Sequence, residues 1–285
     1  MSTIAVLGTL DSKGTEHAFL AKQIQLRGHE VLLIDVGTGG EPQVQPGVNR
    51  YEVAESAGVD LQPILDRRDR GECVAAMVAS APKLLAQLVE EQRIDGVISL
   101  GGGGGTAIAT AAMRVLAIGF PKVMVSTLAS GNTAHYVGTR DIVMIPSIVD
   151  VSGLNSVSRT IFSRAAGAIT GMVDSKVDLN DARPIIAASM FGNTTNLVSM
   201  AREQLEAAGY EVLVFHATGT GGRTMEALIE SGMVAGGLDV TTTEWADELV
   251  GGVLAAGPDR LDAMTRAMVP AVIAPGCLDM VNFGE

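Results

Sequence analysis

Five consecutive glycines, residues 101–105, constrain this chain more than any other feature. Glycine loses more backbone freedom on folding than any other residue, so an ordered run of five needs a physical reason. The run follows an apolar segment, residues 96–100, and precedes an alanine-rich segment that suits a helix, residues 107–116. A strand, a glycine turn and a helix start together favour a bound anion, because exposed backbone N–H groups and the helix dipole both attract it.

We therefore predict that this glycine run and the residue after it bind a phosphate or carboxylate group. A tight turn for close strand–helix packing is the alternative, but it needs only about one or two glycines. The predicted binding residues are Gly101, Gly102, Gly103, Gly104, Gly105 and Thr106.

The composition indicates a globular protein with a large apolar core. The chain has 285 residues, of which 47% are hydrophobic, and its length suits about two domains. Charged residues make up 18%, so we expect part of the surface to be buried between subunits, as in a homodimer. With a net charge of −12 and no basic cluster, binding to nucleic acid or to an anionic membrane is not expected.

Cysteine usage and the first residues favour a cytoplasmic protein. Cys73 and Cys277 lie far apart without CxxC spacing, which predicts free thiols in a reducing compartment. Residues 1–6 lack the basic segment of a signal peptide and enter a strand pattern at once. Residues 96–113 form the longest uncharged stretch, but they are too rich in glycine for a membrane span.

The two halves of the chain resemble each other. Residues 28–40 and 209–222 each contain a glycine, an apolar strand and a Gly-Thr-Gly-Gly turn, in the same order. An apolar strand, a helix and a second apolar strand typify the βαβ unit of a parallel sheet. We therefore expect an α/β fold of two related Rossmann-like domains, residues 1–180 and 181–285. The last apolar strand has no helix after it, so the second domain is expected to be truncated.

Apolar runs and their spacing predict the individual elements. In the first half we expect a helix at 156–173 and strands at 3–8, 30–36, 74–79, 96–100, 121–126 and 142–145. In the second half we expect helices at 195–208, 222–231 and 259–268, and strands at 185–190, 211–216, 235–239 and 271–274.

Polar residues follow most of these strands in the first half, and parallel strands bring such residues to one edge of a sheet. Hydroxyls, backbone donors and one ammonium suit phosphates, while Asp35 suits a ribose diol. Asp11 or Asp141 are candidates to hold Mg²⁺ beside the phosphates. For any single Ser or Thr, capping a turn is the commoner role. Besides the glycine run, the candidates are Thr9, Asp11, Ser12, Lys13, Asp35, Gly37, Thr38, Ser80, Ser126, Thr127, Ser130, Gly131 and Asn132.

The common phosphate-binding and catalytic motifs do not match. Lys13 precedes Gly14, which reverses the Gly-Lys order of a P-loop, and Thr106 stands where a dinucleotide fingerprint has a small third residue. The sequence contains no HExxH, no paired cysteine ligands and no GxSxG elbow.

The second half offers His216 as an acid–base candidate. It ends a predicted strand beside the glycine turn, and Glu244 is the candidate carboxylate partner. The alternative is a histidine that only bonds within its turn. His17 and His29 are expected at the surface, and Cys277 is expected to be a buried structural thiol rather than a nucleophile.

Several motifs together resemble one family along the whole chain. They are residues 8–14, 101–106, 121–131, 136–142, 215–222, 238–244 and 278–284. The chain is similar to the ATP-binding family named for the tomato mosaic virus resistance protein. That resemblance implies a two-domain α/β protein that binds ATP, with Mg²⁺, in its N-terminal domain and forms dimers. Relatives often carry Ser within the glycine run and continue beyond the final motif.

Two functions remain open at this point. The first is an ATP-binding enzyme that acts on a small anionic metabolite at the edge of its second domain, where His216 and Glu244 lie. The second is a nucleotide-binding sensor or interaction module without catalysis. A dinucleotide oxidoreductase is a third possibility, which the incomplete fingerprint argues against.

Overall fold

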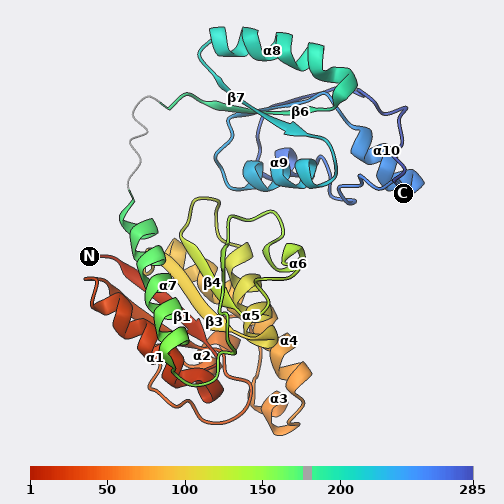
Figure 1. Ribbon diagram of the computed structural model, residues 1–285. Helices are drawn as coiled ribbons and strands as arrows, with labels where there is room; N and C mark the ends of the chain where they lie inside the picture. The colour runs from red at the N-terminus through yellow and green to blue at the C-terminus, as the bar shows by residue number, and fades with distance from the viewer. Residues whose placement is uncertain (176–181, 285) are drawn as a thin grey trace. The chain divides into compact units, whose positions relative to one another are not determined.

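The structure, a computed structural model, describes residues 1–175 and 182–284. The chain divides into two compact units, Met1–Val177 and Asp178–Glu285, and each is described by itself (Figure 1). The predicted domain boundary after residue 180 lies outside the described residues.

The first unit is built on a parallel sheet of five strands in the order β2-β1-β3-β4-β5. The chain therefore moves from β1 to one side for β2 and then to the other side for β3. In a parallel sheet such a reversal separates the two loops that follow the neighbouring strands, and it opens a crevice at their carboxyl ends. The strands are β1 (Thr3–Gly8), β2 (Glu30–Asp35), β3 (Gly96–Gly101), β4 (Lys122–Ser126) and β5 (Val143–Pro146).

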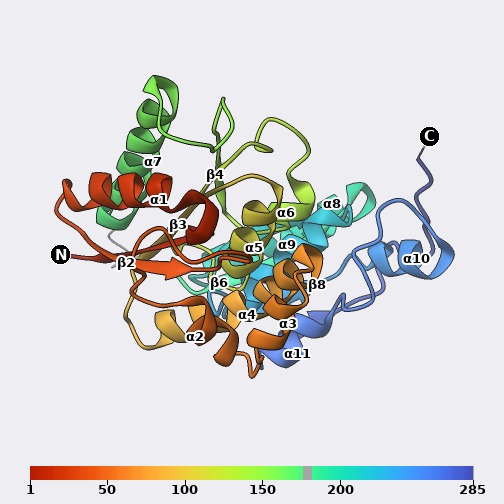
Figure 2. The same ribbon diagram turned by 90° about the horizontal axis from the view of Figure 1, so that it is seen from below.

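Helices cover both faces of this sheet (Figure 2). On one face α1 (Leu10–Gln25) and α7 (Ser156–Asp174) bury a core that includes Phe162. On the other face α2 (Arg50–Glu55), α4 (Arg70–Glu90) and α5 (Gly103–Arg114) bury a second core that includes Met77. The short helices α3 (Gln62–Asp66) and α6 (Ala134–Val137) lie in connections. Burial on both faces explains why the strands are apolar along their length.

The strand predicted at 74–79 is wrong, because these residues lie inside α4. The carboxylate of Asp69 accepts a hydrogen bond from the Glu72 N–H at 3.0 Å and caps the helix. Met77, Leu84 and Leu88 are buried at helical spacing. A short apolar run does not by itself distinguish a strand from a buried helix. The helix is also long and apolar enough to pass for a membrane span, but its buried side chains belong to the core of the first unit.

Two further expectations are corrected by burial. Ser80 lies inside α4 and is fully buried, so it does not reach the edge of the sheet. His17 is fully buried and His29 is 7% exposed, whereas both were expected at the surface. The Nδ1 atom of His17 lies 2.7 Å from the Lys13 carbonyl oxygen, and burial lowers the pKa of its ring.

The second unit repeats this arrangement with four parallel strands in the order β7-β6-β8-β9. Helix α8 (Thr195–Ala207) covers one face of the sheet and α9 (Thr220–Glu230) the other (Figure 1). Strand order and direction match the first four strands of the first unit, which confirms the predicted pair of related α/β domains. The remaining elements are β6 (Ile185–Met190), η1 (Gly192–Thr194), β7 (Glu211–His216), β8 (Gly236–Asp239), α10 (Thr243–Val250), α11 (Asp262–Arg266) and β9 (Ala271–Ile273).

The two glycine turns occupy equivalent places in their units. Residues 37–40 follow β2 and residues 219–222 follow β7, and each strand pairs in parallel with the first strand of its sheet. Both turns therefore lie at the carboxyl edge of their sheets, as the repeated sequence predicts.

A buried ion-pair network fixes the second unit. The guanidinium of Arg260 binds both oxygens of Asp239, at 2.5 and 2.9 Å, and also Glu244 at 2.7 Å and Glu226 at 2.9 Å. Burial lowers the pKa of Arg260, but the hydrogen bonds to Asp239 and Glu244 outweigh it and hold that pKa above its usual range. One side chain thus joins β8, α9 and α10.

We expect Arg260→Met to destabilise the protein by about 3–5 kcal/mol, because it leaves buried carboxylates without their cation. Arg266→Met is the matched control, since Arg266 pairs with Glu230 at the surface. The control should lose less than about 1 kcal/mol. Urea unfolding of both variants measures the difference, and equal losses would contradict a structural role for the network.

Candidate functional site

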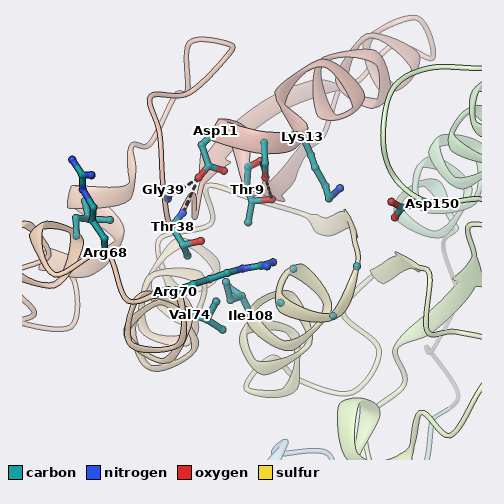
Figure 3. Close-up of a pocket in the computed structure, with 16 residues that line it drawn as sticks. Thr9, Asp11, Lys13, Thr38, Gly39, Arg68, Arg70, Val74, Ile108 and Asp150 are labelled. Atoms are coloured by element: carbon teal, nitrogen blue, oxygen red, sulfur yellow. Dashed lines mark hydrogen bonds between the residues drawn. The ribbon is translucent and has the colours of Figure 1, made fainter.

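A cavity of about 760 Å³ lies at the carboxyl edge of the first sheet (Figure 3). Its wall comes from the segments that follow β1, β2 and β3, so it occupies the crevice opened by the reversal of strand order. Its volume falls within the range of about 300–1,000 Å³ that is usual for small-molecule sites. It is lined by Thr9, Asp11, Ser12, Lys13, Thr38, Gly39, Leu65, Arg68, Arg70, Val74, Gly102, Gly103, Gly104, Gly105, Ile108 and Asp150.

The glycine run forms the end of β3 and the first turn of α5. Gly101 ends the strand, Gly102 is the N-cap, and residues 103–105 begin the helix. The first N–H groups of a helix have no partner within it. No side chain in the described part of the chain caps this end of α5. The helix therefore presents unpaired backbone donors at the wall of the cavity.

Only part of the glycine run is required by the fold itself. A Cβ atom on Gly101 would lie 3.0 Å from the Cα atom of Gly105, so a side chain there meets backbone. A Cβ atom on Gly103 would have its nearest neighbour, Leu128, at 4.0 Å, and one on Gly104 would meet Val74 at 3.6 Å. Neither of these two has a positive φ angle. Because these two residues have no side chain, their backbone is exposed at the wall of the cavity.

Thr106, predicted with the run, lies behind it. The side chain is fully buried, and its hydroxyl oxygen is 2.7 Å from that of Ser126 at the end of β4. It therefore fixes the start of α5 to the sheet.

Two predicted carboxylates position the turns around the cavity. Asp11 Oδ2 accepts hydrogen bonds from the N–H groups of Thr38, at 3.1 Å, and Gly39, at 2.7 Å. Asp35 is 1% exposed, and its Oδ1 accepts from Leu10 at 3.1 Å and Gly37 at 2.8 Å. Burial raises the pKa of Asp35. Asp11 lines the cavity, whereas Asp35 lies behind the wall that it braces.

Lys13 lines the cavity from α1, whereas Arg70 lines it from α4 (Figure 3). The backbone of Lys13 departs from helical geometry, with φ −134° and ψ 27°, at a kink in α1. The ammonium group donates a hydrogen bond to the carbonyl of Val151, in the segment between β5 and α7. The predicted lysine is therefore at the cavity but already has a backbone partner.

Three charged residues of the cavity were missed by the sequence interpretation: Arg68, Arg70 and Asp150. Arg70 begins α4, and its Nη2 atom lies 3.8 Å from the place of a Cβ atom on Gly104. The spacing of Asp69 and Glu72 is typical of a helix start and could have predicted that α4 begins at Arg70. The strand predicted at 74–79 excluded that helix.

Other predicted residues lie away from the cavity. Asp141 accepts hydrogen bonds from Lys122, at the first residue of β4, and from the Gly119 N–H, both at 2.8 Å. It therefore lies at the amino edge of the sheet, and the structure does not bring it to Asp11. Ser130, Gly131 and Asn132 lie between β4 and α6 and do not line the cavity. The described residues contain no cluster of three or more metal-ligating side chains.

In the second unit the structure separates the roles of His216 and Glu244. Glu244 is fully buried, and its Oε1 accepts from the N–H groups of Gly219, at 2.6 Å, and Gly222, at 3.0 Å. Its Oε2 binds Arg260. His216 is exposed, with its ring centroid 5.3 Å from that of Phe191. Within the described ranges no hydrogen bond joins His216 to Glu244.

Cys277 is 9% exposed, and burial together with the nearby Asp279 raises the pKa of its thiol. A raised pKa leaves little thiolate at neutral pH. The thiol is free, as is that of Cys73, which agrees with the predicted absence of a disulfide.

The fold and the cavity define a class of protein: two Rossmann-like domains, the first with a glycine-lined cavity where its strand order reverses. The chain belongs to the uncharacterised protein family UPF0261. Residues 2–178 match the N-terminal domain of that family and residues 183–285 match its C-terminal domain.

Relatives are found in bacteria and in tomato. A UPF0261 protein of Clostridium tetani is 53% identical over 282 residues, which cover 99% of this chain and 70% of the relative. The ToMV susceptible protein tm-1(GCR26) of Solanum lycopersicum is 39% identical over 299 residues, which cover 98% of this chain and 40% of that protein. The predicted membership in the family of the tomato proteins is thereby confirmed, whereas ATP binding stays a prediction.

Solved structures align with most of the chain, but at low sequence identity and low TM-score. MurG of Acinetobacter baumannii is 11% identical, with a TM-score of 0.30, over 96% of this chain and 86% of that one. The UDP-GlcNAc 2-epimerase of Neisseria meningitidis is 12% identical, with a TM-score of 0.32, over 97% and 88%.

Two alanine substitutions test which glycines the fold needs. Gly101→Ala should destabilise the protein by about 1–3 kcal/mol, because its methyl group meets backbone that cannot move away. Gly103→Ala should be neutral or stabilise it by about 0.4–1 kcal/mol, because alanine restricts the unfolded chain. Urea unfolding of both variants checks this, and a destabilised Gly103→Ala would show that this glycine serves the fold.

Proposed function

We propose that the first unit binds ATP or a related nucleotide, with its phosphates on the amino end of α5. The observation that carries this proposal is that glycines the fold does not need, Gly103 and Gly104, line a cavity large enough for a nucleotide. In a helix each glycine costs roughly 1 kcal/mol relative to alanine. A phosphate that approaches the backbone closely gives these residues a physical reason.

The charge of the cavity wall supports an anionic ligand. The chain has a net charge of −12, yet the lining contains three cationic side chains, Lys13, Arg68 and Arg70, and two carboxylates. Asp11 directs one of its oxygens to backbone N–H groups, which offset part of its charge. The positive end of the α5 dipole adds to the attraction.

The choice of ATP among phosphorylated ligands rests on the family resemblance, and so does Mg²⁺. Asp11 is the predicted metal ligand that lines the cavity, and its Oδ1 atom is buried without a hydrogen-bond partner in the described part of the chain. A cation bound to the phosphates is a natural partner for such an oxygen. A homodimer in the cytoplasm and an absence of nucleic-acid or membrane binding remain predictions from composition.

For the second unit, the geometry favours a binding or sensing role over catalysis by His216 with Glu244. The Glu244 carboxylate is occupied by Arg260 and two backbone N–H groups, so it is not free to orient an imidazole. The nucleotide-binding sensor or interaction module is therefore the better supported of the two functions. An enzyme that acts on a small anionic metabolite would need His216 to work with other groups.

We expect Gly103→Val to abolish ATP binding, because its side chain covers the backbone donors of α5. Gly171→Val is the matched control, since Gly171 lies within α7 with no atom within 4 Å of an added Cβ. Isothermal titration calorimetry with ATP and Mg²⁺ measures both folded variants. If Gly103→Val binds ATP with unchanged affinity, the proposal is wrong.

We expect Lys13→Ala to weaken ATP binding by about 1.5–3 kcal/mol, the scale of a hydrogen bond to a charged group. Lys22→Ala, an exposed position on the same helix, should bind as the unmodified protein does. The same titrations measure both variants. If the binding free energy falls by only a few tenths of a kcal/mol, Lys13 does not contact the ligand and only donates to the Val151 carbonyl.

A further inference from the structure

The side chain of Arg70 lies next to the amino end of α5 at the wall of the cavity. Its Nη2 atom is 3.8 Å from the place of a Cβ atom on Gly104, and Val74, one turn further along α4, meets the same point at 3.6 Å. Figure 3 shows its side chain directed toward the glycine turn. A group seated on the first N–H groups of α5 therefore lies within reach of this guanidinium.

This guanidinium has no protein partner among residues 1–175 and 182–284. Nearby carboxylates are engaged elsewhere. Glu72 binds the Nε atom of Arg67 at 2.5 Å, and Asp69 accepts from the Glu72 N–H at 3.0 Å. Arg70 is thus a cation at the cavity without a carboxylate partner among the described residues.

The surroundings of Arg70 favour a bound anion. Arg70 is the first residue of α4 and lies beside the first turn of α5, so it is near the positive ends of two helix dipoles. A cation at a helix N-terminus is destabilising, whereas an anion there is stabilising. An anion bound on the first N–H groups of α5 would be attracted by both helix ends and by the guanidinium.

We propose that Arg70 is the specificity residue of the cavity and binds the phosphate of the ligand beside the glycine turn. This proposal rests on the proposed function and adds the residue that selects a phosphorylated ligand. The backbone donors of residues 103–105 bind some of the phosphate oxygens. The guanidinium of Arg70, next to these donors, binds others, because its planar fork matches two phosphate oxygens at once.

The test separates phosphate contact from contact with the base. Arg70→Ala, Arg70→Lys and the control Arg164→Ala are titrated with ATP and with inorganic tripolyphosphate. Arg164 is a suitable control because it is an exposed arginine of α7 that does not line the cavity. Thermal unfolding of each variant should agree within about 2 °C, since exposed side chains contribute little to stability.

We expect Arg70→Ala to weaken both probes by the same factor, about ten- to a hundredfold, the scale of charge-assisted hydrogen bonds. Arg70→Lys should recover part of this loss, because it keeps the charge but not the fork. Arg164→Ala should bind both probes as the unmodified protein does.

Each other result overturns a stated part. If Arg70→Ala weakens ATP but not tripolyphosphate, Arg70 contacts the nucleoside and the proposal is wrong. If Arg70→Ala binds both probes normally, the proposal is wrong while nucleotide binding stands. If the unmodified protein binds neither probe, the proposed function and the role of Arg70 both fail.

Discussion

The position of β1 between β2 and β3 is the constraint on which the candidate site depends. Because the chain leaves β1 for one side and returns on the other, the loops after β1 and β3 diverge instead of packing together. The space between them is closed from below by the sheet and from the side by α4. The glycine turn, Lys13 and Arg70 come from distant parts of the sequence, and this one topological feature gathers them.

The two units show two solutions to the same physical problem. Each has unpaired backbone donors at the carboxyl edge of its sheet. In the second unit Glu244 occupies the N–H groups at the start of α9, and Arg260 then neutralises that carboxylate. In the first unit Asp11 does the same for the turn at Thr38 and Gly39, but the start of α5 receives no side chain from the described residues. The first N–H groups of α5 thus remain available at the wall of the cavity.

Much of the fold was predictable, because strands buried on both faces are apolar throughout and the βαβ pattern repeats. The family was predictable because its motifs run along the whole chain. The segment at 74–79 was not, since short apolar runs look alike in strands and in buried helices. The role of Arg70 was missed for the same reason, because its position at the cavity depends on α4 beginning at that residue. The burial of Asp35 was equally hidden, since a strand end in sequence does not show which side of a turn covers it.

The hydrogen bond from Lys13 to the Val151 carbonyl has a thermodynamic consequence. Glu16, one turn further along α1, accepts a hydrogen bond from the Gly153 N–H, so α1 holds the segment between β5 and α7 at two points. A ligand that recruits the Lys13 ammonium removes one of these two attachments. The affinity for the ligand and the order of the segment between β5 and α7 are then thermodynamically linked. Because such coupling is reciprocal, a change that breaks the contact of this segment with Lys13 increases the affinity of Lys13 for the ligand.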